Sequence, residues 1–370
     1  MAINAGTIGQ DARQDPSAGY WMFSARADAG WFGWSVIVPL LLYLPAYWTL
    51  GSAAVWPLYL VYVACFATPH LWMTWVVTGS RQARGMYASR TWWLPVAVTA
   101  AIVAIVPFTR DVGGWDAFFT GMTLLGAYHI LKQHLGMLKI YDARYVQWTG
   151  DAGFVSQMRP FRWLCGLAFA LPVWWVWTMP SLDIVVDVQR FRLLSPEVPS
   201  WTLWPYVATL VALALRCAWT LVRRHRAGKP LPTAHLVLAA AAGLSYLAAF
   251  GLVPTRDYLL SLAIFITYHD LQYIGFVWMF QRRRAGWLVA AGHGLDFVHA
   301  LAEANRPLPY LGLAGAFSLL VVGLIVALPP AGAIGVVVFV NVVHYLMDGM
   351  VWQRRHYPGL HAHLGPAGAR

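Results

Sequence analysis

The sequence predicts an all-α protein, a polytopic integral membrane helical bundle with about ten transmembrane helices. Composition is the first observation that predicts it: 59% of the 370 residues are hydrophobic and only 11% are charged, whereas a soluble domain is about 25% charged. The second observation is that the apolar runs approach the roughly 20 residues that a helix needs to cross a bilayer. The third is the placement of basic residues between those runs.

Ten apolar segments follow one another along the chain. Prolines interrupt several of them, and membrane helices tolerate proline because neighbouring groups pair the freed carbonyls. The segments are 31–50, 54–78, 92–108, 115–138, 161–179, 201–222, 233–253, 257–280, 310–328 and 331–352.

The loops between these segments alternate in charge. Basic residues follow every even-numbered segment, whereas the loops after odd-numbered segments are uncharged or nearly balanced. Because cytoplasmic loops carry an excess of Lys and Arg, this alternation predicts a multi-pass protein of the inner (plasma) membrane with both termini in the cytoplasm. The basic residues are Arg81, Arg84, Arg90, Lys139, Arg144, Arg159, Arg162, Arg223, Arg224, Arg226, Lys229, Arg282, Arg283, Arg284, Arg354 and Arg355.

The same reading gives the domain layout. We expect a polar cytoplasmic N-terminal tail over 1–30, a transmembrane helical domain over 31–353 and a cytoplasmic C-terminal tail over 354–370. The first thirty residues lack the basic-then-apolar layout of a cleaved signal peptide.

Residues 285–308 form the largest cytoplasmic loop. His293, Asp296 and His299 fall three apart within it, which predicts one side of an interfacial helix or lid. Whether His293 and His299 belong to a site or to a polar face stays open.

The placement of the cysteines and the origin of the net charge argue against other classes of protein. The three cysteines lie in apolar runs without a CxxC pair, which argues against a disulfide framework or a thiolate site. The net charge of +11 is explained by the basic cytoplasmic loops, so we expect membrane lipid and no nucleic acid as a partner.

Four of the even-numbered segments carry a histidine at a similar depth. His70, His129, His269 and His344 lie eight to eleven residues before the cytoplasmic ends of their segments. At 1.5 Å per residue this spacing puts them within roughly 5 Å of one another in depth. Because ionisable residues at membrane depth usually face the bundle interior and mark a functional site, the pattern predicts one cluster.

Other polar residues accompany these histidines. Asp270 adjoins His269, Asp348 is four residues after His344 on the same helix face, and His134 is five after His129. We expect Asp270 or Asp348 to orient a ligand or complete the shell, and His134 to ligate a second metal or shuttle protons. Outer hydrogen bonds are expected from Gln133, Gln272, Tyr128, Tyr268, Tyr345 and Asn341.

The donor set points to a transition metal. Neutral imidazole suits iron, copper, zinc and nickel, and no thiolate is nearby, so we expect non-haem iron first and copper or zinc next. Any one histidine in a membrane helix is explained as well by an interhelical hydrogen bond; the shared depth is what favours ligation. Lys132 is expected to snorkel to the interface rather than face a substrate.

The pattern resembles that of the Brp/Blh-type membrane carotenoid oxygenases. The resemblance rests on Pro69-His70, on the pairs Tyr128-His129 and Tyr268-His269, and on His344 with Asp348, and it covers about forty residues. It implies a multi-pass helical protein whose intramembrane histidines bind non-haem iron; the substrate cannot be carried over. The HxxxH and HxxHH boxes of membrane fatty-acid desaturases are absent from the sequence.

Three hypotheses of function remain. The first is an oxidoreductase, a metal-dependent membrane oxygenase or hydroxylase that activates dioxygen on a lipophilic substrate such as a lipid, isoprenoid or carotenoid, with an electron donor that the sequence does not identify. The second is a proton-coupled transporter in which intramembrane His and Asp relay protons. The third is a bis-histidine haem protein for electron transfer.

Overall fold

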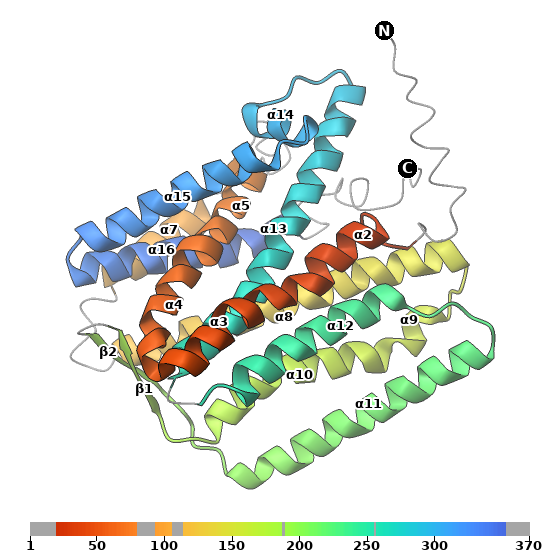
Figure 1. The fold of residues 1–370 in the computed structure, drawn as a ribbon, viewed down its shortest axis with the longest axis horizontal. Coiled ribbons are helices and arrows are strands. Elements are labelled where there is room, and N and C mark those ends of the chain that lie inside the picture. Colours follow the sequence, from red (N-terminus) through yellow and green to blue (C-terminus); the bar gives the residue numbers. More distant parts are fainter. Residues whose placement is uncertain (1–19, 80–92, 106–113, 187–188, 255–256, 353–370) are drawn as a thin grey trace. The chain divides into compact units, whose positions relative to one another are not determined.

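The computed structural model describes residues 20–79, 93–105, 114–186, 189–254 and 257–352 (Figure 1). The described residues are about 84% helical, so the prediction of an all-α class is confirmed. The tails 1–19 and 354–370, which we expect to be cytoplasmic, lie outside the described residues.

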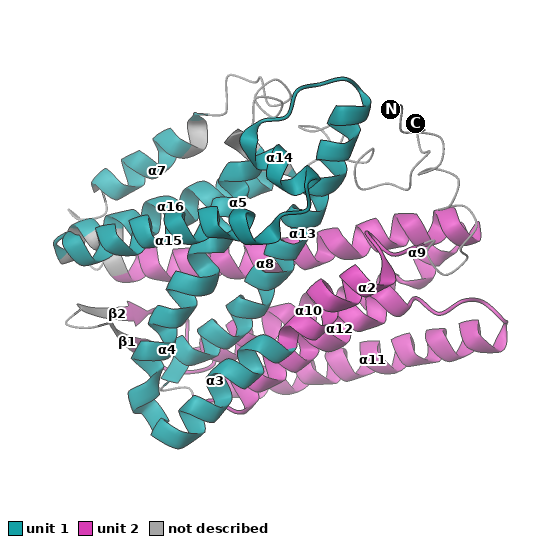
Figure 2. Ribbon diagram, turned by 45° about the horizontal axis from the view of Figure 1, so that its top comes forward, with its two compact units in different colours: residues 1–7, 37–115, 256–370 teal, residues 8–36, 116–255 magenta. Residues whose placement is uncertain are grey.

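The chain divides into two compact units, coloured separately in Figure 2. The first unit comprises 1–7, 37–115 and 256–370, and the second comprises 8–36 and 116–255. Each unit is described by itself.

The first unit is a set of packed helices. α5 contacts α13, α15 and α16, and α13 also contacts α3, α4 and α14. The helices are α3 (Ile37–Leu50), α4 (Val55–Tyr62), α5 (Thr68–Gly79), α7 (Leu94–Ile105), α13 (Tyr258–Ala290), α14 (Phe297–Glu303), α15 (Pro307–Ala327) and α16 (Pro330–Val351).

The second unit holds the remaining elements. α10 packs against α11 and α12, and a π-helical turn, Ala29–Gly33, packs against α12. The elements are α2 (Ala25–Asp28), α8 (Gly114–Thr149), α9 (Phe154–Gln157), α10 (Arg159–Trp177), β1 (Leu182–Val186), β2 (Gln189–Leu193), α11 (Leu203–Arg226) and α12 (Thr233–Tyr246).

Among the residues that the structure describes, five helical runs are long and apolar enough to cross a membrane: Ala25–Val77, Ser200–Arg226, Thr233–Gly251, Tyr258–Ala290 and Pro307–Ala327. This agrees with a membrane protein built from helices. The count of ten spans stays a prediction.

Hydrogen bonds fix the buried helix α13 against α3 in the first unit. Asp257, the residue before α13, accepts hydrogen bonds from Tyr47 (2.6 Å) and Ser52 (3.0 Å). Ten residues further on, Thr267 pairs with the hydroxyl of Tyr43 at 2.8 Å. These contacts hold the position of α13 along its axis, and with it the polar residues in its middle.

A π-helical turn, Val63–Ala67, precedes α5. Pro69 lacks the N–H that an α-helix needs for its ladder, and the hydroxyl of Thr68 donates to the carbonyl of Val63 at 2.8 Å. The turn therefore absorbs the helix break caused by proline directly before His70.

The N-terminal tail is shorter than the sequence predicts. Tyr20 and Met22 are buried, and the buried carboxylate of Asp28 accepts hydrogen bonds from the Met22 amide and the Tyr141 hydroxyl. Arg144 donates to the carbonyl of Trp21. The prediction of a polar tail over 1–30 is therefore wrong from Tyr20 onward, because these side chains pack into the second unit.

Two connecting segments have structure of their own. The link 181–200 contains an antiparallel hairpin in which Leu182 pairs with Leu193. Residues 285–308, where the sequence predicts an interfacial helix or lid, do not form one helix, since α13 continues to Ala290 and α14 begins only at Phe297.

Candidate metal centre

Three helices of the first unit carry the buried polar residues that the sequence singles out. α5 carries His70, α13 carries His269 and Asp270, and α16 carries His344 and Asp348. Each of these side chains is at most 4% exposed. Since α5 packs against both α13 and α16, it brings the three sets together around His70.

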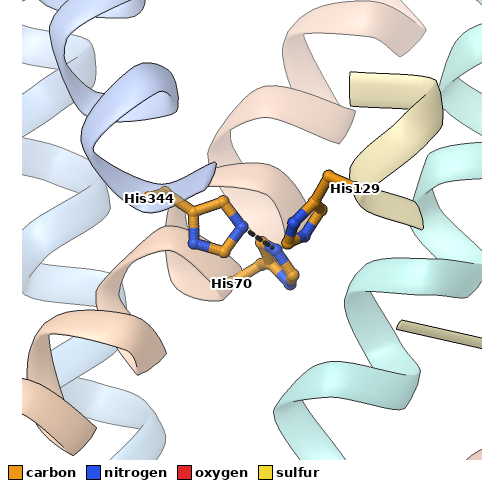
Figure 3. Close-up of side chains that lie close together, drawn as sticks. All are labelled: His70, His129 and His344. Atoms are coloured by element: carbon orange, nitrogen blue, oxygen red, sulfur yellow. Dashed lines mark hydrogen bonds between the residues drawn. The ribbon is translucent and has the colours of Figure 1, made fainter. Parts of the chain in front are cut away.

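His70 and His344 face each other through the same ring nitrogen. Their Nε2 atoms are 2.8 Å apart, and the ring centroids are 4.4 Å apart (Figure 3). In the absence of an ion this contact is a hydrogen bond. It also leaves both nitrogens directed at one point.

The other nitrogen of His344 is held by a hydroxyl. Nδ1 lies 2.7 Å from Oγ1 of Thr74, and this hydroxyl donates its own hydrogen to Oδ1 of Asp348 at 2.8 Å. Because Thr74 has a single hydroxyl hydrogen, the Nδ1–H of His344 is the donor in the first bond. The neutral imidazole therefore presents an unprotonated Nε2 as a ligand.

Asp348 is further held by Tyr273 of α13. The phenol donates to Oδ1 of Asp348 at 2.5 Å, and Nε1 of Trp352 donates to the phenol oxygen at 3.3 Å. The ring of Tyr273 lies 4.5 Å from that of His70. This is the kind of outer hydrogen-bonding shell that orients metal-ligating histidines.

His70 meets a second acid through its opposite nitrogen. Its Nδ1 lies 3.5 Å from Oδ1 of Asp270, and the ring of His269 is 4.9 Å away. One ligand atom from each of these three residues lies within 4.8 Å of the others. They are thus close enough to share one ion.

Asp270 is the residue most in need of a cation. It is 2% exposed, and its Oδ2 accepts no hydrogen bond from any residue that the structure describes. A buried carboxylate is costly unless it is paired, hydrogen-bonded or bound to a metal. Asp270 therefore fits the role of a direct ligand, whereas Asp348 is occupied by two hydroxyl donors and fits an outer role.

The residues that the sequence did not single out lie on the same helix faces as the histidines. Thr74 is four residues after His70, and Tyr273 is four after His269, just as Asp348 is four after His344. Residues four apart are neighbours on a helix. The spacing marks these positions as neighbours of the histidines, but it does not show that Thr74 and Tyr273 take part in their hydrogen bonds.

His129 and His134 lie on α8 in the second unit. His129 is 9% exposed and His134 is 1% exposed. Nδ1 of His134 lies 2.9 Å from the carbonyl of Ile130, and its ring is 4.3 Å from that of Phe169. The expected roles of His129 and His134 as metal ligands stay predictions.

The loop histidines have different surroundings. His293 is exposed, whereas His299 is buried and its Nδ1 lies 2.7 Å from Oδ1 of Asp296. Burial raises the pKa of the Asp296 carboxyl, but the hydrogen bonds from His299 and the charge of Arg284 outweigh it and hold the pKa below its ordinary value of 3.8. His299 thus anchors the start of α14.

Comparisons with family models, curated proteins and solved structures find no match to this chain. The resemblance to Brp/Blh-type oxygenases stays a prediction from the sequence.

Proposed function

We propose that the protein is a membrane-embedded oxidoreductase in which His70, His269, Asp270 and His344 hold a non-haem metal ion, most favourably iron. A single observation carries the proposal: the buried carboxylate of Asp270, whose Oδ2 has no hydrogen bond from the described residues, lies beside the buried imidazoles of His70 and His269. Charge compensation by a cation explains why so polar a cluster is buried there.

The hydrogen bonds around the cluster support ligation. Thr74 holds Nδ1 of His344 and connects it to Asp348, so that Nε2 is the ligand atom directed at His70. Such outer partners set the tautomer and ring orientation of metal-bound histidine. His70 lies beside the second acid, Asp270.

The choice of ion follows from the donors. Nitrogen and carboxylate ligands with no thiolate suit iron, and copper or zinc are the next candidates. When bound, iron supplies the capacity to activate dioxygen. The protein itself contributes a buried, water-poor site with oriented ligands.

The distance between the Nε2 atoms of His70 and His344 fits a small metal ion better than it fits the bis-histidine haem alternative. Axial ligands on opposite faces of a haem, each about 2 Å from the iron, would be about 4 Å apart with the macrocycle between them. The Nε2 atoms of His70 and His344 are only 2.8 Å apart. These two histidines therefore suit neighbouring positions on a small ion.

The substrate that we propose is lipophilic: a lipid, an isoprenoid or a carotenoid that reaches the site from the bilayer. The five apolar helical runs support a membrane location. Orientation in the inner membrane with cytoplasmic termini follows from the charge pattern of the loops. The electron donor is not assigned.

Elemental analysis of the detergent-purified protein, together with its visible spectrum, tests the metal. We expect iron or another transition metal at about one or two ions per chain and no haem band. His344→Ala should lower the amount of bound metal per chain, and His129→Ala should do the same if the sequence-based assignment holds. His293→Ala, which changes an exposed histidine, is the matched control and should keep the metal.

Oxygen uptake with lipid, isoprenoid and carotenoid substrates then tests the reaction. Full metal occupancy in every single histidine variant would contradict the site. A protein that stays metal-free after iron or copper is supplied would favour the proton-coupled transporter.

A further inference from the structure

We propose that His70 is shared by two metal positions, one at Nε2 facing His344 and one at Nδ1 facing Asp270 and His269. This inference rests on the proposed metal site and goes beyond it in the number of ions and in the bridging role of one imidazole.

The first position is defined by His70 and His344. Two nitrogens that are each about 2.1 Å from one ion lie about 3.0 Å apart when the bond angle is 90°. The observed Nε2–Nε2 separation of 2.8 Å differs from this by only a few tenths of an ångström. An ion can therefore replace the hydrogen bond with little change in the separation of the two nitrogens, once the rings turn to direct their lone pairs at it.

The second position is defined by His70, Asp270 and His269. Ligand atoms about 2.1 Å from one ion and about 110° apart are about 3.4 Å from each other. Nδ1 of His70 and Oδ1 of Asp270 are 3.5 Å apart, and one ligand atom from each of His70, Asp270 and His269 lies within 4.8 Å of the others. The separation of Nδ1 and Oδ1 is therefore closer to that of two ligands on one tetrahedral ion than to the length of a short hydrogen bond.

One imidazole serves both positions only as its anion. The second ion replaces the remaining ring N–H proton of His70, and that proton is released to water. The imidazolate, Asp270 and Asp348 then offset three of the four positive charges of two divalent ions. Asp270 and Asp348 lie in the same buried cluster, so the charges nearly balance without solvent.

A titration with copper(II) tests this inference. Copper(II) binds imidazole tightly, and the coupling between the unpaired spins of two ions shows whether they share a bridging imidazole. The metal-free protein in detergent is titrated with copper, and bound copper per chain and the electron paramagnetic resonance spin count are both measured. A parent carrying His356→Gln, His361→Gln and His363→Gln removes the histidines near the C-terminus as adventitious sites.

We expect two copper ions per chain in the parent and a spin count well below two, since an imidazolate couples the spins of its two ions. The Asp270→Asn protein should keep only the ion between His70 and His344, with a full spin. The His344→Gln protein should keep only the ion beside Asp270 and His269, also with a full spin. Asp270→Glu keeps the carboxylate and His293→Gln changes an exposed residue; both should retain two coupled ions.

The measurement on the parent alone decides the outcome, whether or not each variant folds. One copper per chain with a full spin would overturn the bridge and leave the proposed metal site intact. Two copper ions with two uncoupled spins would also overturn it, because the ions would then not share His70. No bound copper would overturn both proposals.

Discussion

At the residue scale, the partner of the second ring nitrogen decides what each histidine can do. In His344 that partner is Thr74, which connects the imidazole to Asp348. In His70 it is Asp270 at 3.5 Å. The hydroxyl of Thr74 occupies Nδ1 of His344 and leaves Nε2 as its ligand atom. In His70, by contrast, Nδ1 faces a carboxylate that can itself bind a metal, so both ring nitrogens are candidate ligand atoms.

Thr74→Val should weaken metal binding by about 10- to 100-fold, the usual effect of removing an outer partner of a ligating histidine. The change keeps the shape of the side chain but removes the hydroxyl that accepts from Nδ1 of His344 and donates to Asp348. Competition with a chelator in detergent measures the affinity.

Thr74→Ser keeps the hydroxyl and serves as the matched control. It should bind metal nearly as tightly as the parent, although it also lacks the methyl group. If Thr74→Val bound metal as tightly as the parent, the tautomer of His344 would not depend on Thr74.

The acids and histidines could be predicted from the sequence, but Thr74 and Tyr273 could not. An ionisable residue within an apolar run is conspicuous because of its cost in hydrocarbon. Threonine and tyrosine are ordinary in membrane helices, so their roles become visible only when α5 and α13 are packed together.

At the scale of elements, one close approach in the second unit depends on a glycine. A Cβ added to Gly33 would lie 2.7 Å from Cγ1 of Val237 on α12. Valine is stiff at χ1, so its methyl group cannot turn away easily. Gly33→Ala should therefore destabilise the protein by about 1–3 kcal/mol, the usual cost of overpacking.

Gly30 lies in the same π-helical turn and gives the control, because a Cβ added there meets nothing within 4 Å. Gly30→Ala should be neutral in thermal unfolding. Val237→Ala combined with Gly33→Ala should recover most of the loss. A Gly33→Ala protein as stable as the parent would show that α12 can move aside.

The stabilisation by the ion pairs that connect the end of α8 to the end of α11 should depend on pH. Asp151 accepts from the buried guanidinium of Arg224 at 3.0 Å and from Lys229 at 3.1 Å. Burial raises the pKa of its carboxyl, but these two cations outweigh it and bring the pKa below its ordinary value of 3.8. The stabilisation is therefore complete above about pH 4 and is lost as the pH falls through the lower folded value.

Asp151→Asn should lower the melting temperature by a few degrees at pH 7 and by less at pH 3, because below the ordinary pKa of 3.8 part of the stabilisation by the charge is lost. Differential scanning fluorimetry in detergent at both pH values measures this. Asp183→Asn is the control, because its pair with Arg192 is exposed and exposed pairs contribute little. An equal loss at both pH values would assign the effect to packing.

Element types were easier to predict than element ends. Apolar segments predicted the helices, but α8 and α13 continue well beyond theirs, to Thr149 and Ala290. The hydropathy signal fades once a helix leaves the hydrocarbon, while the hydrogen bonds of the helix continue. The burial of residues 20–28 was missed for a related reason: Asp28 looks like a solvent-exposed residue until its hydrogen-bond partners, such as Tyr141, are known.

At the scale of the whole molecule, the argument for one metal cluster began with orientation. The four intramembrane histidines share a depth only if their helices all run toward the cytoplasm, and that direction was inferred from the basic loops. Within the first unit, the contacts among His70, His269 and His344 agree with this inference. The direction of each helix in the membrane is still to be measured.

Cysteine labelling in intact cells measures it. In a background with Cys65, Cys165 and Cys217 changed to Ala, single cysteines are placed in loops that the charge pattern assigns to opposite sides. A membrane-impermeant maleimide should label Ser200→Cys and Leu328→Cys directly, because the loops after segments five and nine are expected outside. Ala227→Cys and Ala291→Cys follow segments six and eight, and should react only after the cells are permeabilised.

The labelling also bears on the metal site. The reverse pattern would invert the topology but keep the histidine-bearing helices parallel, so the depth argument would survive. A mixed pattern, in which Ala227→Cys and Ala291→Cys lie on opposite sides, would make the helices that end there antiparallel. It would refute the ten-span arrangement, and the site would then rest on the contacts among α5, α13 and α16 alone.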